Sequence, residues 1–144
     1  MRPRIREARP EDAAAIASLM ADIDHPVPAT DVPQRLAAVT GAPGKVLVAE
    51  AGSEVVGVVS VNRLALLHRD TPVAFLSALV VRADHRGRGV GRALVDAVQS
   101  QAAAWGCATV ELTSRDDRIG AHQFYARLGF DTRSRKFVRA VPQA

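Results

Sequence analysis

The sequence predicts a mixed α/β domain, in which a single layer of sheet carries helices on its faces. The chain has 144 residues, a length that suits one domain better than two. Hydrophobic residues make up 48% of it but aromatic residues only 4%, so the core must be built from Ala, Val, Leu and Ile. Short apolar runs alternate with stretches of helical periodicity, in the order strand, two helices, three strands, helix, strand, helix, strand.

Local signals predict the elements of the N-terminal half. A first strand covers Ile5 to Ala8, and Pro10 opens a helix with apolar residues spaced i, i+3, i+4 and i+7 at Ile16, Leu19, Met20 and Ile23. A shorter helix is expected from about Asp31 to Val39. Three strands follow, over residues 45–49, 55–61 and 73–81. The last is apolar nearly throughout, as is typical of a strand covered on both faces.

The C-terminal half is predicted to contain two helices, each of which ends at a glycine. The first runs from Val90 to about Trp105 with Gly106 after it, and its buried face comprises Val90, Leu94, Val95, Val98 and Ala102. A strand follows over residues 108–113. The second helix has its apolar face at Ala121, Phe124, Tyr125 and Leu128, and Gly129 ends it. A last strand is expected from Phe130 to about Val138.

Composition excludes several classes of site and location. Cys107 is the single cysteine, so an internal disulfide and a cysteine-based metal cluster are excluded, and we expect a buried core thiol. The four histidines show no ligand spacing, so no metal is expected. No apolar run approaches the ~18 residues of a membrane helix, and Met1 to Arg6 lacks the apolar part of a signal peptide. We expect a soluble, cytoplasmic protein without a membrane partner.

The most informative segment joins the strand that ends at Val81 to the helix that begins at Val90. It reads Arg86-Gly87-Arg88-Gly89-Val90-Gly91, and Arg92 follows. A glycine-rich turn at a helix start directs backbone N–H groups outward at the positive end of the helix dipole, where a phosphate is favoured. The formal charge of +4 and the three clustered arginines suit a small phosphorylated ligand.

Other anion-binding classes fit this segment less well. A dinucleotide fingerprint needs G-x-G-x-x-G, but position 92 is Arg, although Glu111 lies where a ribose-binding acid would. A phosphate loop of the nucleotide-hydrolase type needs G-K-[S/T], which the chain lacks. General nucleic-acid binding is disfavoured because aromatic residues that could stack on bases are scarce. We therefore expect no nucleic-acid partner.

With these classes set aside, the remaining pattern, R-x-x-G-x-G at Arg86, Gly89 and Gly91, resembles the GCN5-related N-acetyltransferase (GNAT) family. Residues 121–130, AHQFYARLGF, are similar to the late A-x-x-F-Y-x-x-x-G-F segment of that family. The order of elements agrees as well, so the resemblance covers most of the chain. It implies a single mixed, mostly antiparallel sheet flanked by helices, one acetyltransferase domain over residues 1–144, and acetyl-CoA as the acyl donor.

The resemblance also implies roles for individual residues. The strand before the loop is expected to carry a bulge and to splay from its neighbour, so that the backbone of Leu79, Val80 and Val81 pairs with the pantetheine arm. The pyrophosphate cradle is expected from Arg86, Gly87, Arg88, Gly89, Val90, Gly91 and Arg92. Tyr125 is the candidate general acid for the departing thiolate. A backbone N–H of Val80 or Val81 would stabilise the oxyanion.

Several alternatives stay open from the sequence. The strand over residues 73–81 has no carboxylate, and Ser77 is its only polar residue, so the general base could be Glu111, His68, Asp70, His122 or a water chain. Arg118 stands where relatives often have an asparagine. A primary amine on a small molecule is the favoured acceptor, with a protein N-terminus or lysine as the alternative. A non-catalytic acyl-CoA-binding domain and a homodimer are both compatible with the sequence.

Overall fold

The computed structural model describes residues 2–115 and 118–143, which form two compact units, residues 1–112 and 113–144, each described here by itself. The first unit contains five strands and three α-helices. In chain order they are β1 (Arg4–Glu7), α1 (Ala13–Ala21), α2 (Val32–Gly41), β2 (Gly44–Ala51), β3 (Glu54–Leu64), β4 (Val73–Val81), α3 (Val90–Ala104) and β5 (Thr109–Glu111). Short 3-10 turns precede each helix, at Pro10–Asp12, Ala29–Asp31 and Ala83–His85.

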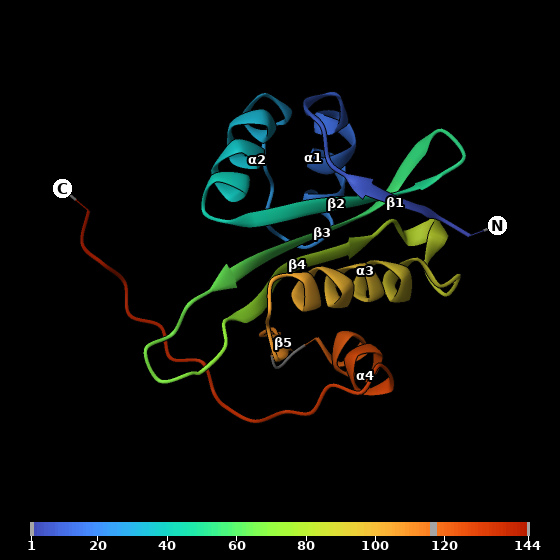
Figure 1. Cartoon of the computed structure of the whole chain (residues 1–144). Coiled ribbons are helices and arrows are strands. Elements are labelled where there is room, and N and C mark those ends of the chain that lie inside the picture. Colours follow the sequence, from blue (N-terminus) through green and yellow to red (C-terminus); the bar gives the residue numbers. More distant parts are fainter. Residues whose placement is uncertain (1, 116–117, 144) are drawn as a thin grey trace. The chain divides into compact units, whose positions relative to one another are not determined.

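The five strands form one sheet in the order β1-β2-β3-β4-β5. The first four are antiparallel neighbours, and β5 runs parallel to β4. Helices α1 and α2 cover one face of the sheet and α3 covers the other (Figure 1). The predicted mixed, mostly antiparallel sheet flanked by helices is therefore confirmed for this unit.

The apolar core lies on both faces of the sheet. On the α1/α2 face, Ile16, Leu19 and Val32 pack with strand residues Val46, Val48, Val58 and Val80. On the other face, all five residues predicted for the inner side of α3 are buried. A Cβ added at Gly57 would lie 3.0 Å from Leu94 Cδ1 and 3.1 Å from Val90 Cγ1. The absence of a side chain there lets the first turns of α3 pack closely on β3.

A charged cluster connects the turn before α1 to strands β1 and β2 at the edge of the sheet. Arg6 donates to both carboxylate oxygens of Asp12, at 2.8 Å each, and its Nε donates to Glu50 on β2. The backbone N–H of Arg9 also donates to Asp12, at 2.7 Å. These contacts hold the pKa of Asp12 below its usual range, and the hydrogen bond from Arg6 has the largest effect. Burial of the carboxylate opposes this shift. Asp12 is thereby satisfied although it is buried.

The second unit contains α4 (Ile119–Arg127) and an extended tail. The predicted apolar face of α4 is half-buried, at Ala121, Phe124, Tyr125 and Leu128. The strand expected from Phe130 to about Val138 is not formed, and that prediction is wrong for this structure. No strand is assigned after β5 in the described residues, so the β-forming residues of this segment have no ladder partner, and residues 131–143 are all exposed. No described helix of the chain is long and apolar enough to cross a membrane.

Two smaller predictions also need correction. The first strand begins one residue earlier than expected, although the N–H of Ala8 still donates to Val46 O at 2.9 Å beyond the end of β1. Cys107 is half-buried rather than buried. It lies in the turn after α3, where its N–H closes a Schellman motif on Ala102 O at 2.9 Å, with Gly106 at φ +76° before it.

Candidate active site

The loop between β4 and α3 presents backbone donors, as its glycine pattern predicts. Gly87 and Gly89 have φ of +75° and +84°, values that L side chains rarely adopt, and both are exposed. The first intrahelical bond of α3 runs from the Ala93 N–H to Gly89 O at 3.0 Å. The N–H groups of residues 90–92 therefore have no partner within the helix, and they lie at its positive end. This arrangement fits a diphosphate.

The arginines around this loop fall into three groups. Arg82 is held by acids, through Asp84 at 2.7 Å and Glu54 at 3.2 Å, and these contacts raise its pKa. Arg86 donates from Nε to the carbonyl of Val81 at 3.2 Å and so closes the turn. Arg88 and Arg92 are exposed on either side of the helix start. Because Arg82 is bound to carboxylates, an anion would meet mainly Arg88, Arg92 and the backbone donors.

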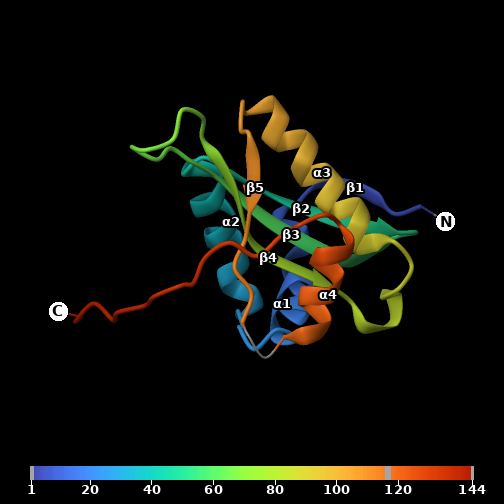
Figure 2. The same cartoon turned by 90° about the horizontal axis from the view of Figure 1, so that it is seen from below.

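Strands β4 and β5 separate after three residue pairs. The parallel ladder joins Val73, Ala74 and Phe75 to Thr109, Val110 and Glu111, and Leu76 to Val81 have no partner on that side within the described sheet (Figure 2). On the other side of β4, the register with β3 shifts between Ser60 and Val61, so that Ser77 forms a bulge. The Ser77 hydroxyl donates to Ser60 O at 3.3 Å. The expected bulge and splay are both present.

The register determines which residues of β4 present their backbone to the open edge. The N–H of Arg82 donates to Val56 O at 2.8 Å, so Arg82 faces β3. Backbone direction alternates along an antiparallel strand, so the groups of Val80 also face β3, while those of Leu79 and Val81 face away from it. Of the two residues expected to supply an oxyanion donor, only Val81 has its backbone N–H on the open edge. The backbone of Leu79 faces the same edge. Val80 instead packs its side chain in the core.

Two of the candidate bases are engaged in contacts of their own. Glu111 ends the ladder with β4, and its carboxylate accepts from Arg69 Nη1 at 2.8 Å and from Thr109 Oγ1 at 2.7 Å. His122 Nε2 lies 2.7 Å from Arg115 O. Since a carbonyl only accepts, that nitrogen carries the hydrogen and cannot take a proton. His68 and Asp70 are exposed in the loop after β3.

Tyr125 lies near the C-terminal end of α4, in the second unit. A Schellman motif ends this helix, with Phe130 N–H donating to Tyr125 O and Gly129 N–H to Ala126 O, both at 3.1 Å. The rings of Phe124 and Phe130 meet the Tyr125 ring edge-on, with centroids 5.2 and 5.6 Å away. Burial raises the pKa of the phenol, and the positive charge of Arg118 opposes the shift. The group is therefore protonated at neutral pH and able to donate.

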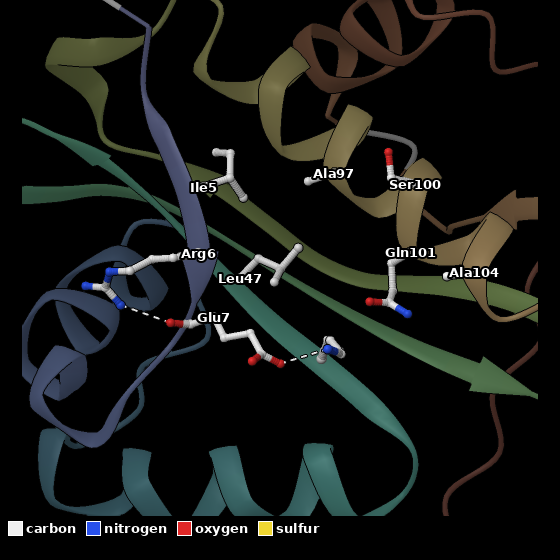
Figure 3. A pocket seen from close by; sticks show the side chains of 9 residues that line it. Ile5, Arg6, Glu7, Leu47, Ala97, Ser100, Gln101 and Ala104 are labelled. Carbon is white, nitrogen blue, oxygen red and sulfur yellow. Dashed lines mark hydrogen bonds and ion pairs between the residues drawn. The ribbon is translucent and has the colours of Figure 1, made fainter.

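A recess of the first unit lies along the other half of α3. Figure 3 shows Ile5 and Leu47 of the sheet facing Ala97, Ser100 and Gln101 of the helix. Glu7 and Lys45, which form an ion pair, also line the recess. Its lining includes no residue of the loop after β4. The recess is thus separate from the loop between β4 and α3.

Comparison with known proteins identifies the family of the chain. A model of the acetyltransferase (GNAT) family matches residues 12–130. The chain belongs to this family. It is 36% identical, over 97% of its length and 94% of the relative, to the aminoglycoside N(6')-acetyltransferase type 1 of Stenotrophomonas maltophilia. It is also 31% identical to the aminoalkylphosphonate N-acetyltransferase of Salmonella typhimurium, over 61% of this chain and 57% of that enzyme.

Solved structures support the GNAT fold as well. A transcriptional regulator from Bacillus halodurans superposes with a TM-score of 0.85 at 25% identity, covering 96% of this chain and 99% of the other. The aminoglycoside N-acetyltransferase AAC(6')-Iy, solved in complex with CoA, has a TM-score of 0.80 at 18% identity over 97% of this chain and 100% of that chain. The GNAT chain described here is thus an enzyme, an N-acetyltransferase that uses acetyl-CoA as its acyl donor.

Proposed function

We propose that this GNAT enzyme acetylates a primary amine of a small molecule, with an aminoglycoside as the first acceptor to test. The observation that supports this most strongly is the 36% identity to an aminoglycoside acetyltransferase over nearly the whole of both chains. A second relative is named for another small amine, an aminoalkylphosphonate. We further propose that residues 1–144 act as one domain, because the family match spans both units, and that the enzyme is cytoplasmic.

The first unit would hold the donor through its backbone. Acetyl-CoA supplies an acetyl group activated as a thioester. Gly87, Gly89 and the N–H groups at the start of α3 would bind the pyrophosphate, with Arg88 and Arg92 adding charge. Leu79 and Val81 would pair with the pantetheine amides along the open edge of β4, as an added strand does. A backbone N–H on this edge would also stabilise the developing oxyanion.

Tyr125 would act as the general acid in direct transfer to the amine. Expulsion of a thiolate requires a proton, and a phenol whose pKa is raised holds that proton throughout the neutral range. The aromatic contacts of Phe124 and Phe130 fix the orientation of the ring. The acceptor amine would lose its proton to water or to one of the exposed groups in the loop after β3.

A thiol-release assay tests the acceptor class. Acetyl-CoA would be mixed with the enzyme and one of three amines: an aminoglycoside with a 6'-amino group, an aminoalkylphosphonate, or a peptide with a free N-terminal amine. We expect turnover with a small amine at a kcat/KM at least about tenfold above that for the peptide. Preference for the peptide would overturn the proposed acceptor class and leave acetyl-CoA binding untouched.

A further inference from the structure

The bulge of β4 carries the one polar side chain of that strand. Ser77 is the single polar residue between Val73 and Val81. Its side chain is exposed, whereas Leu76 before it is buried and Ala78 after it is half-buried. Helices cover both faces of the sheet elsewhere, so an exposed residue in the middle of this strand marks a point that a ligand can reach from solvent.

The hydroxyl group of Ser77 has a defined orientation. It donates its single hydrogen to the carbonyl of Ser60 on β3, at 3.3 Å. The two lone pairs of the oxygen therefore point away from β3, toward the side on which β4 and β5 separate. No donor among the described residues occupies them. Ser77 thus presents a hydrogen-bond acceptor, and not a donor, to the open side of β4.

The position of Ser77 along β4 corresponds to the reactive end of the donor. With acetyl-CoA bound as proposed above, on which this inference rests, its diphosphate lies at the loop after Val81. Its pantetheine arm then passes Val81 and Leu79 toward the start of the strand. The arm cannot pair beyond the bulge, because β4 is joined to β5 from Phe75 backwards, where Phe75 pairs with Glu111. The thioester is therefore expected beside Ser77.

We propose that Ser77 Oγ accepts a hydrogen bond from the acceptor amine and so directs the lone pair of its nitrogen at the thioester carbonyl carbon. In the transfer, the nitrogen–carbon bond forms and the carbon–sulfur bond breaks. The sulfur takes up one proton, and the nitrogen loses one to water. An alcohol is too weak a base to take that proton, so Ser77 orients the nucleophile and does not deprotonate it. A strand without a carboxylate can receive an amine in this way.

Three substitutions at this position test the role of the oxygen. Ser77→Ala removes the acceptor, and Ser77→Cys keeps the shape of the side chain but replaces oxygen by sulfur, a weak acceptor. Ser77→Thr keeps the hydroxyl group on a residue that favours strands. Thiol release is measured at saturating acetyl-CoA with whichever of the three amines named above the unsubstituted enzyme acetylates fastest. The kcat/KM for the amine should fall about tenfold or more in the Ala and Cys variants and stay within about threefold in the Thr variant.

Donor affinity separates this role from a purely structural one. The Kd of acetyl-CoA, measured by calorimetric titration, should stay within about twofold in all three variants, because the arm pairs with backbone groups. Ser100→Ala on α3, in the lining of the recess, is the matched control and should change neither quantity. An unchanged kcat/KM in Ser77→Cys, or a Kd that rises in step with the loss of kcat/KM, would overturn the inference. Preference of the unsubstituted enzyme for the peptide would overturn the proposed acceptor class alone, since the same comparison is then made with the peptide.

Discussion

Residues 1–112 and residues 113–143 differ in how their conformation is maintained. The first unit has a sheet covered on both faces and side chains that are fully buried, among them Leu19, Val48 and Leu94. The second unit has one short helix, a capped turn and no buried residue among those described. The elements proposed to bind acetyl-CoA thus belong to the unit with its own core, and the candidate acid belongs to the unit without one.

This difference separates two ways of positioning functional groups, one through the backbone and one through a side chain. In the proposed site, the loop after β4 and the open edge of β4 would act through backbone groups, so their geometry depends on the packed sheet and on two glycine conformations. Tyr125 would act through its side chain, which has aromatic neighbours and lies beside a helix cap. Donor binding should therefore tolerate changes in the second unit that abolish turnover. The following predictions test this separation, from the largest expected effect to the smallest.

Replacement of Tyr125 by Phe should separate donor binding from chemistry. The ring and its packing remain, but the proton donor is lost, so kcat should fall about 100-fold or more while acetyl-CoA affinity is retained. Thiol release measures the rate, and calorimetric titration measures the affinity. A parallel loss of affinity would indicate a structural role for the hydroxyl group, and an unchanged kcat would rule out this residue as the acid.

Truncation of one leucine in each unit measures the difference in packing. Leu94→Ala removes a fully buried side chain and should lower the free energy of unfolding by roughly 3 kcal/mol. Leu128→Ala removes a half-buried one and should lower it by about half of that or less. Urea unfolding followed by circular dichroism measures both values. Equal losses would show that the second unit is packed as tightly as the first.

The charged cluster at the start of α1 should make the first unit sensitive to acid. Arg6 holds the pKa of Asp12 and of Glu50 below their ordinary values, so both carboxylates bind protons more weakly when folded than when unfolded. Their contribution is present above the unfolded pKa values of about 4 and is lost as the pH falls further. Asp12→Asn should flatten this part of the stability profile. An unchanged slope between about pH 5 and pH 2 would exclude Asp12 as its source.

A pair of glycine substitutions should change stability in opposite directions. Gly89→Ala forces a side chain into φ +84° and should destabilise the loop by about 1 to 2 kcal/mol while weakening acetyl-CoA binding. Gly120→Ala lies on α4, where a Cβ would meet nothing within 4 Å, and should stabilise by about 0.5 to 1 kcal/mol. Thermal unfolding with and without acetyl-CoA measures both. Equal effects would mean that the loop conformation does not require glycine.

Much of the first unit could be predicted from the sequence because its signals are local. The bounds of β4 and the buried face of α3 follow from apolar runs, periodicity and terminal glycines. The register of β4 could not be predicted, because the bulge at Ser77 depends on β3, which is distant in sequence. The ion pairs of Arg6 with Glu50 and of Arg69 with Glu111 join segments more than 40 residues apart and leave no local pattern.

The incorrect strand in the tail has a related cause. The residues from Phe130 to Val138 favour extended structure, but a strand forms only where a partner strand is available, and sequence propensity does not supply one. The same limit applies to the active site. The motif around Gly89 identified the loop, whereas the assignment of Leu79 and Val81 to the open edge needed the hydrogen bond from Arg82 to Val56.

Backbone amide exchange, measured by NMR with acetyl-CoA and separately with NAD, tests the central claim most directly. That claim is that the open edge of β4 and the loop after it bind acetyl-CoA. The account predicts that acetyl-CoA protects the amides of Leu79, Val81, Gly87 and Gly89, while the amide of Val80, which faces β3, stays as protected as before. Protection by NAD alone, or no change between residues 79 and 92 with saturating acetyl-CoA, would contradict it.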